Sequence, residues 1–483
     1  MRIILLVSLF LFVSSLKAKE RPNIVILFAD DLGVTDLACY GAEYGNTYHE
    51  TPHIDALAKQ GMRFSDAYAA SPVCSPTRAS ILTGKYPARL KLTDFIPGQI
   101  QPQFKRASTM RLEQQFLDPG ERTFAHALKE GGYSTWFFGK WHLGKGTPAD
   151  FGFEQEYGAQ TSEHKRFYPF IKQKNLKGKP GDYVTDVMSQ QAVECIAKQR
   201  EQWDRGQKKP FLLYMSYYLV HMPIKARQEA IDYFTQKKKS KHWKRADYAA
   251  MLKILDDSVG TLMKALDDYG FADNTMVVFY SDNGGHKCTS NHPFRAHKGS
   301  LYEGGIRVPL IVKWPAKITP HSKSSELVNT PDIFPSLLET ANLALEPQNH
   351  LDGQSFYPAL ITGKVTQGKA IFWHHPHYRD NATDVPASVI RQGDYKLIRH
   401  YDTGKYELFN LAKDPAETND LSQLHPRLVI QLRKKLDAWL KNLNASVPHK
   451  NSAYDPEKAK DELWGGPMSV KIRQAERAQQ EKN

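Results

Sequence analysis

The chain of 483 residues lacks a hydrophobic segment long enough to cross a membrane. The apolar run near its N-terminus, Ile3–Val13, is shorter than the roughly 20 residues that a membrane-spanning helix needs. Arg2 precedes this run and Leu16-Lys17-Ala18 follows it as a candidate cleavage site, which is the order found in secretory signals. We therefore expect residues 1–18 to be a signal peptide, with a mature protein that is periplasmic or secreted and keeps no stable membrane anchor.

The sequence is also poor in cysteine. No two cysteines form the C-x-x-C pair typical of zinc sites, and they are too few to hold a chain of this length together by disulfides. The segment His49–His53 matches the zinc pattern H-E-x-x-H, but Pro52 would break the helix that this pattern requires. We expect Thr51 to cap a helix over Pro52–Gln60 instead. The four cysteines are Cys39, Cys74, Cys195 and Cys288.

The composition is that of a folded globular protein, with 41% hydrophobic and 24% charged residues. A chain of this length is large for a single core, so we expect a large domain and a smaller one. The net charge of +13 favours anionic partners without identifying them.

Two apolar runs end in oxygen-bearing side chains. Asn23–Ala29 leads into Asp30 and Asp31, and Thr275–Ser281 leads into Asp282 and Asn283. Continuous apolar runs are typical of strands covered on both faces, and ligands bind at the carboxyl edge of such sheets. If the two strands are neighbours, the four side chains converge as an all-oxygen site for Ca²⁺, with Mg²⁺ as the alternative. A solvated turn is the other interpretation of the Asp30-Asp31 pair.

The segment Ser71–Leu90 contains C-x-P-x-R at Cys74, Pro76 and Arg78, followed by Ala-Ser-Ile-Leu-Thr-Gly-Lys. Ser75 is a candidate helix cap, and Pro76 suits a first helical turn. Cys74 would then lie just ahead of a helix N-terminus, whose free N–H groups favour an anion. A small buried cysteine before an ordinary helix is the alternative.

Three further segments carry candidate catalytic groups. In Gly132–Gly144, Lys140 and His142 are two residues apart and can point to the same side of an extended chain. His221 follows the apolar run Pro210–Tyr218, and Lys298 lies within Arg295–Val312. From the residues alone, each of these side chains could equally be structural.

Together these motifs resemble the formylglycine-dependent, arylsulfatase-like sulfatases of the alkaline phosphatase superfamily. The similarity includes G-Y-x-T-x-x-x-G-K-W-H-L-G at Gly132–Gly144 and K-G-x-x-x-E-G-G-I-R-V-P from Lys298, and it extends over residues 21–445. It implies an α/β fold in which helices flank a large, mixed, mostly parallel sheet. A smaller C-terminal subdomain with an antiparallel sheet and a helix would follow.

The resemblance also implies roles for individual residues. Cys74 would be oxidised to formylglycine by a formylglycine-generating enzyme, and a hydroxyl of its geminal diol would attack sulfur. Arg78 would steady this group, while Lys140, His221 and Lys298 would hold the sulfate. His221 or Lys298 would protonate the departing alcohol, and His142 would accept the proton that accompanies sulfate release. The metal ligands would be Asp30, Asp31, Cys74, Asp282 and Asn283.

The domain organisation follows from the same pattern. We expect the catalytic domain at residues 19–365 and the C-terminal subdomain, including a polar tail, at 366–483. Arg295, His297, His374, His375 and His377 are candidate substrate-binding residues, although surface positions or strand-end packing explain them equally well. The basic run Lys237–Arg245 is typical of a solvated helix end or loop, with binding of nucleic acid or of an acidic polysaccharide as the alternatives.

These observations predict an exported sulfatase that acts on a sulfated carbohydrate of the galactose or N-acetylgalactosamine sulfate type. A phosphonate monoester or phosphodiester hydrolase of the same superfamily is the catalytic alternative. A non-catalytic protein that binds sulfated glycans is the second. No nucleic-acid partner is expected.

Overall fold

The computed structural model describes residues 21–98, 107–109, 114–160, 166–170, 173–379 and 385–455. The expected signal peptide at residues 1–18 and the tail beyond residue 455 lie outside these ranges. Among the described residues, no helix combines the length and the apolar composition that crossing a membrane requires. All four cysteines are free thiols.

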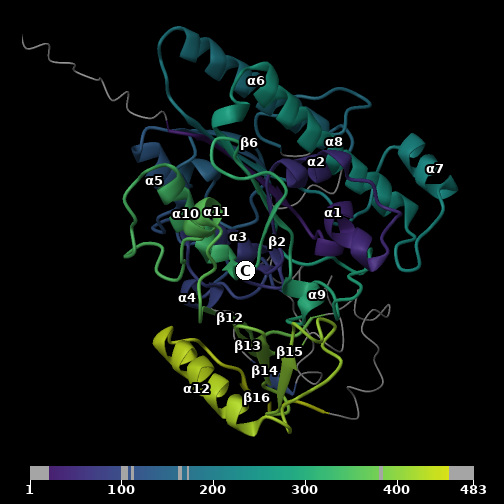
Figure 1. Cartoon of the computed structure of the whole chain (residues 1–483), viewed down its shortest axis with the longest axis vertical. Coiled ribbons are helices and arrows are strands. Elements are labelled where there is room, and N and C mark those ends of the chain that lie inside the picture. The colour runs from purple at the N-terminus through teal and green to yellow at the C-terminus, as the bar shows by residue number, and fades with distance from the viewer. Residues whose placement is uncertain are drawn as a thin grey trace, which may run out of the picture.

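The centre of the molecule is an eight-stranded sheet (Figure 1). Strand β1 lies between β7 and β8 and is parallel to both, while β9 runs antiparallel to β8 and β2. The expected mixed, mostly parallel sheet is therefore confirmed. In spatial order the strands are β10 (Ser322–Ser324), β2 (Met62–Phe64), β9 (Leu310–Lys313), β8 (Thr275–Ser281), β1 (Asn23–Ala29), β7 (Phe211–Ser216), β5 (Ser134–Lys140) and β6 (Gln155–Gln160).

Helices cover both faces of this sheet. Val25 and Leu27 of β1 belong to a core with α2 (Pro52–Gln60), α6 (Val184–Asp204) and α8 (Ala246–Asp268). Alternate residues of the same strand, such as Ile26, face a second core, which explains why the β1 sequence is continuously apolar. That second core includes α3 (Cys74–Thr83), α5 (Phe124–Glu130) and α10 (Ile333–Thr340).

Shorter elements connect these layers. The two-stranded pairs are β3 (Ala67–Tyr68) with β11 (Val328–Asn329), and β4 (Ser108–Thr109) with β16 (His449–Lys450). The remaining helices of this part are α1 (Ala38–Gly41), α4 (Pro87–Leu90), α7 (Gln228–Gln236), α9 (Glu303–Ile306) and α11 (Tyr357–Thr362).

A four-stranded antiparallel sheet and one helix form the C-terminal subdomain, drawn in yellow-green at the bottom of Figure 1. Trp373 fastens it to the larger domain by packing on Tyr68 and donating to the Ala69 carbonyl at 2.7 Å. The predicted boundary near Val365 falls between α11 and the first strand of this sheet and stays a prediction. The elements are β12 (Ala370–His375), β13 (Ala387–Gln392), β14 (Tyr395–His400), β15 (Tyr406–Asn410) and α12 (Pro426–Asn442).

Three local expectations differ from the structure. Cys74 is the first residue of α3 rather than the residue before it, and Val73 is the cap. Ser75 does not cap the helix because its hydroxyl accepts from the Ile96 N–H at 3.1 Å. The two glycines of Glu303–Gly305 favour a turn by sequence, but this segment begins α9, where the glycines allow close approach to the carbonyls of Ala296 and Ser300. The helix over Pro52–Gln60 is confirmed with Thr51 at the cap position. The Thr51 side chain itself makes no capping hydrogen bond, and its Oγ1 accepts from the Ala38 N–H instead.

Candidate active site

The candidate site lies at the carboxyl edge of the central sheet. Asp30 and Asp31 follow β1, and Asp282 and Asn283 follow β8, which pairs with β1 in register up to Ala29 and Ser281. The Asp31 N–H donates to Asp282 at 3.1 Å, and Asn283 Nδ2 donates to Asp31 Oδ1 at 2.9 Å. The predicted convergence of the two strand ends is therefore present.

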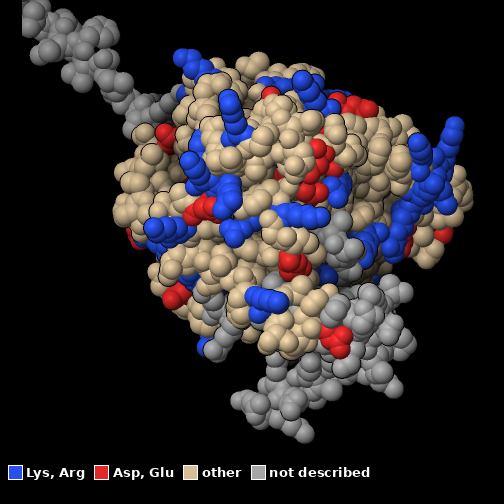
Figure 2. Space-filling view, turned by 90° about the horizontal axis from the view of Figure 1, so that it is seen from below, with Lys and Arg blue, Asp and Glu red and all other residues tan. Residues whose placement is uncertain are grey.

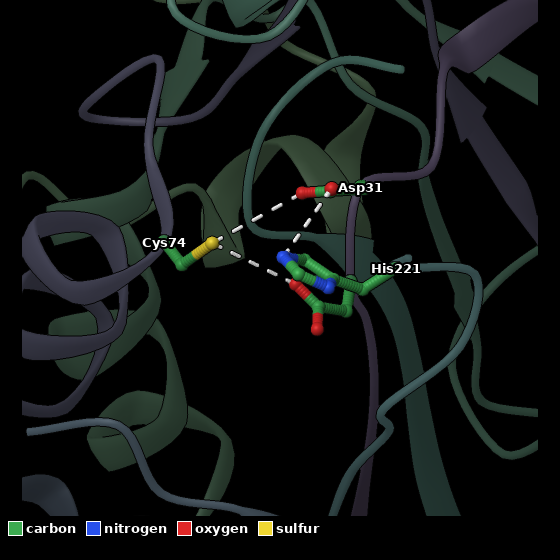
Figure 3. Close-up of side chains that lie close together, drawn as sticks. Asp31, Cys74 and His221 are labelled. Atoms are coloured by element: carbon green, nitrogen blue, oxygen red, sulfur yellow. Dashed lines mark hydrogen bonds and ion pairs between the residues drawn. The ribbon is translucent and has the colours of Figure 1, made fainter. Parts of the chain in front are cut away.

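Cys74 faces this edge from the N-terminus of α3. Its Sγ lies 3.8 Å from Asp30 Oδ1, 4.0 Å from Asp31 Oδ1 and 3.0 Å from Lys298 Nζ. Figure 3 shows Cys74, Asp31 and His221 pointing toward one another from three different parts of the chain. Burial raises the pKa of the Cys74 thiol to about 11. An unmodified Cys74 would therefore be a weak nucleophile at neutral pH, because the thiolate is the reactive form.

Two lysines neutralise the two adjacent carboxylates. Lys140 Nζ lies 2.7 Å from Asp30 Oδ2, and Lys298 Nζ lies 2.5 Å from Asp31 Oδ1. Burial alone would raise the pKa of both aspartates, but Lys140 at Asp30 and Lys298 at Asp31 hold these values well below the usual range. Both carboxylates are therefore ionised at neutral pH.

Arg78 connects three of the strands. Its guanidinium donates to Asp282 Oδ2 at 2.7 and 3.0 Å, to the Lys140 carbonyl at 3.2 Å and to Ser216 Oγ at 2.7 Å. Burial, followed by the nearby charge of Asp30, raises the pKa of Asp282 to about 6. Ser216 was not among the predicted site residues. Its position at the carboxyl end of β7 is the sequence signal that could have identified it.

The oxygen atoms gathered at this edge of the sheet are suited to binding a hard metal cation. Asn283 Oδ1 is fully buried and lacks a hydrogen-bond partner among the residues that the structure describes, although the amide nitrogen of the same side chain is paired. A buried acceptor without a donor is costly, and a cation bound among Asp30, Asp31, Asp282 and Asn283 would satisfy it. These are the oxygen ligands that Ca²⁺ and Mg²⁺ take.

His221 and His142 flank the cluster. His221 Nε2 lies 3.7 Å from Asp31 Oδ2, and its side chain is 26% exposed, so this part of the site is open to solvent. His142 is buried, and its Nε2 contacts the Ile96 carbonyl at 2.7 Å. This contact places the proton on Nε2, which leaves Nδ1 as a buried acceptor without a partner in the described part of the chain. Burial, followed by the charge of Lys140, keeps the pKa of His142 well below its ordinary value.

The candidate substrate-binding side chains have other partners in the structure. Arg295 stacks on Tyr302 and donates to the Glu417 carbonyl at 3.0 Å, and His297 Nδ1 lies 3.2 Å from Asn291 Nδ2. His374, His375 and His377 are buried rather than arranged on an exposed rim. The first contacts Ser388 and the Ser446 carbonyl, and the other two contact Thr93. Their role in substrate binding stays a prediction.

Comparison with known proteins agrees with this geometry. Residues 22–343 match the sulfatase family model, and residues 294–445 match the model described as N-sulphoglucosamine sulphohydrolase, C-terminal. The chain is 34% identical to a sulfatase of Formosa agariphila, over 91% of this chain and 93% of that protein. It is 29% identical to an N-acetylgalactosamine-6-O-sulfatase of Bacteroides thetaiotaomicron, over 87% and 93%.

A solved structure shares the fold. Ps i-CgsB in complex with k-i-k-neocarrahexaose superimposes with a TM-score of 0.74 at 30% identity, and the match covers 87% of this chain and 93% of that chain.

Proposed function

This chain belongs to the sulfatase family, whose members are sulfuric ester hydrolases, and on that premise we propose its specific reaction. It is an exported enzyme that removes sulfate from a sulfated carbohydrate. The reaction uses a formylglycine formed from Cys74 and a bound divalent cation, Ca²⁺ or Mg²⁺.

The position of Cys74 carries this proposal. Cys74 is the first residue of a buried helix. Its Sγ lies between the carboxylates of Asp30 and Asp31 and the Nζ of Lys298, which is 3.0 Å away. A residue at this point faces both the candidate cation ligands and the positive charges that an anionic substrate requires. When formylglycine and the cation are present, they supply a nucleophilic oxygen and the positive charge that favours its ionised form.

The other residues of the site bind, orient and transfer protons. Lys140 and Lys298 provide ammonium groups for the sulfate oxygens, and His221 approaches from the solvent side. Arg78 fixes the edge of the sheet through Asp282 and the Lys140 carbonyl. His221 or Lys298 protonates the departing alcohol. His142, whose Nδ1 has no partner, is the base that accepts the proton released with the sulfate.

The substrate we propose is a sulfated galactose or N-acetylgalactosamine within a glycan. The Bacteroides relative is named an N-acetylgalactosamine-6-O-sulfatase, and the similar solved structure holds k-i-k-neocarrahexaose. Both names support a carbohydrate ester over a simple aryl sulfate as the natural substrate.

The decisive experiment combines mass and activity. Protein made together with a formylglycine-generating enzyme is digested with trypsin, and the mass of the peptide Phe64–Arg78 is measured. We expect the aldehyde in place of the thiol, together with hydrolysis of an aryl sulfate. Both Cys74→Ala and Cys74→Ser should reduce turnover by at least roughly 10³-fold, because each removes a nucleophile that acts as part of one unit.

Matched substrates then test the class of ester. Sulfate and phosphate esters of one aryl alcohol are compared, followed by sulfated galactose and N-acetylgalactosamine oligosaccharides. An unmodified thiol in a protein as active as Cys74→Ala would exclude the mechanism. Faster hydrolysis of the phosphate esters would point to a phosphonate or phosphodiester hydrolase. Saccharide binding without hydrolysis of any ester would point to a glycan-binding protein.

A further inference from the structure

The basic run Lys237–Arg245 forms the loop between α7 and α8. Its sequence allows a solvated loop, a surface for nucleic acid or a surface for an acidic polysaccharide. In the structure, the run is held in place at intervals by side chains that turn inward.

Three residues anchor the loop. Lys237 Nζ contacts the Tyr48 carbonyl at 2.9 Å and Glu50 Oε1 at 2.5 Å. Ser240 Oγ accepts from the Thr47 N–H at 3.0 Å. Trp243 is buried with 1% of its surface exposed. The backbone that carries the remaining lysines is therefore fixed to the body of the protein.

The residues between these anchors project outward. Lys238, Lys239, Lys241 and Lys244 are exposed, and none of them forms an ion pair within the part of the chain that the structure describes. Figure 2 shows a group of blue side chains projecting at the right, on the side where α7 lies in Figure 1. Like charges this close repel one another unless an anion lies between them.

A ring contact connects this loop to the loop that carries Lys298. His242 stacks on His292 with ring centroids 3.9 Å apart and planes 13° apart. Asn291, the residue before His292, donates to the carbonyls of Gly285 and Ala296 and so holds the two sides of the turn together. Lys287 of the same loop is exposed and depresses the pKa of His297, after the larger effect of burial.

The loop also reaches the site itself. Lys298, near the C-terminal end of the loop, lies 3.0 Å from Cys74 Sγ and 2.5 Å from Asp31 Oδ1. The loop that carries Lys298 therefore connects the site, through the contact between His292 and His242, to the loop that carries the exposed lysines. We call Lys238, Lys239, Lys241, Lys244 and Lys287 the basic surface.

We propose that the basic surface binds the sulfate groups of a polymeric sulfated glycan beyond the sugar that is being desulfated. This inference rests on the proposed function and adds that the substrate is a chain rather than a single sugar. Several ammonium groups at spaced positions match a polymer that carries sulfates at intervals. Such a surface raises the local concentration of a polyanion and speeds its association. A small monoester would gain nothing from it, because it carries no second anion.

The test replaces four of these lysines together, as Lys238→Gln, Lys239→Gln, Lys241→Gln and Lys244→Gln. The control makes the same change in charge at four exposed lysines elsewhere, Lys364→Gln, Lys405→Gln, Lys413→Gln and Lys434→Gln. Binding of dextran sulfate is measured at several salt concentrations, and kcat/KM is measured on an aryl sulfate.

We expect the first variant to bind dextran sulfate at least roughly tenfold more weakly than the control at low salt, with a shallower dependence on salt. Its kcat/KM on the aryl sulfate should equal that of the wild type. Equal loss in the control, or no loss in either variant, would overturn the proposal. Selective weakening of duplex DNA binding with unchanged dextran sulfate binding would also overturn it, by assigning the surface to nucleic acid.

The two proposals fail in different ways. Binding of dextran sulfate needs no turnover, so it reports on the basic surface even in Cys74→Ala. If the wild type hydrolyses no sulfate ester while the lysine variant still shows the selective loss of dextran sulfate binding, the basic surface is supported and the proposed reaction is excluded.

Discussion

Two charge clusters in this molecule, one buried and one buried or partly buried, have the same formal composition and different surroundings. Each contains three carboxylates and three cations. The active-site cluster consists of Asp30, Asp31 and Asp282 with Arg78, Lys140 and Lys298. The interdomain cluster consists of Asp66, Glu303 and Glu417 with Arg307, Arg391 and Lys396.

The interdomain cluster joins the helix α9 and the segment before β3 to the C-terminal sheet. Lys396 Nζ lies 2.9 Å from Glu303 and 2.8 Å from Glu417, and Arg391 lies 2.6 Å from Asp66. Tyr68 adds a hydrogen bond to Glu303 at 2.6 Å. These contacts bridge residues far apart in the sequence and hold the two parts of the protein together.

The active-site cluster differs in three respects. The Cys74 thiol lies against it, the adjacent Asn283 Oδ1 has no hydrogen-bond partner among the described residues, and the neighbouring His221 is partly exposed to solvent. Balanced formal charge is therefore common to both clusters. What distinguishes the active-site cluster is a buried oxygen acceptor that a cation would satisfy, together with access from solvent.

The largest expected effect on stability is in the interdomain cluster. Lys396→Met leaves Glu303 and Glu417 without their shared cation and should lower the free energy of unfolding by roughly 3–5 kcal/mol. Denaturant unfolding measures this loss, with the exposed Lys413→Met as control. A variant as stable as the wild type would show that the interdomain cluster does not hold the domains together.

The corresponding change in the active-site cluster should affect catalysis. Lys298→Met removes an ammonium that faces Cys74 and Asp31, and kcat/KM on an aryl sulfate should fall by roughly 10²–10³-fold. Lys287→Met on the same loop should leave this value unchanged. If Lys298→Met kept full activity while unfolding at much lower denaturant, Lys298 would be structural like Lys396.

Cation binding is a further property in which the two clusters should differ. At a Ca²⁺ or Mg²⁺ concentration roughly 100 times Kd, the wild type should gain about 2.7 kcal/mol in unfolding free energy, because only the folded state binds the ion. Asn283→Leu should reduce this gain, whereas the exposed Asn419→Leu should keep it. Thermal unfolding with and without a chelator measures the difference, and the more effective ion identifies the metal. Equal gains in both variants would remove Asn283 from the ligand set.

The smallest expected effect is a pH dependence in the C-terminal sheet. Burial lowers the pKa of His375 from 6.5 to about 3, so the folded state favours the neutral imidazole. The stabilisation is complete above pH 6.5 and is lost as the pH falls toward 3. From about pH 7.5 to about pH 5, His375 should account for a loss of roughly 2 kcal/mol.

His375→Gln tests this dependence. We expect unfolding curves of the variant to change less between the two pH values, with KM for a sulfated oligosaccharide unchanged. His425→Gln, at an exposed position, should keep the wild-type dependence. A raised KM with an unaltered pH dependence would instead support the predicted role of His375 at the substrate.

Much of the sheet could be predicted from the sequence because its strands are buried on both faces. Asn23–Ala29 and Thr275–Ser281 have the bounds that their apolar patterns predict. The helix α6, which has a weakly patterned sequence, was not anticipated. Glu303–Gly305 was misassigned because its two glycines are typical of turns, whereas here they make room for neighbouring carbonyls.

The sequence by itself determined the sulfatase family, now confirmed by the comparisons, and placed oxygen-bearing side chains directly after β1 and β8. Both follow from local patterns: contiguous motifs, and apolar runs that end in aspartate and asparagine. Only the tertiary structure decided that β1 and β8 are neighbours, that the histidines of β12 are buried, that Asn283 Oδ1 lacks a partner among the described residues and that His242 stacks on His292. These features depend on contacts between residues that are distant along the chain. A local sequence pattern does not specify which distant side chain will pack against a given residue.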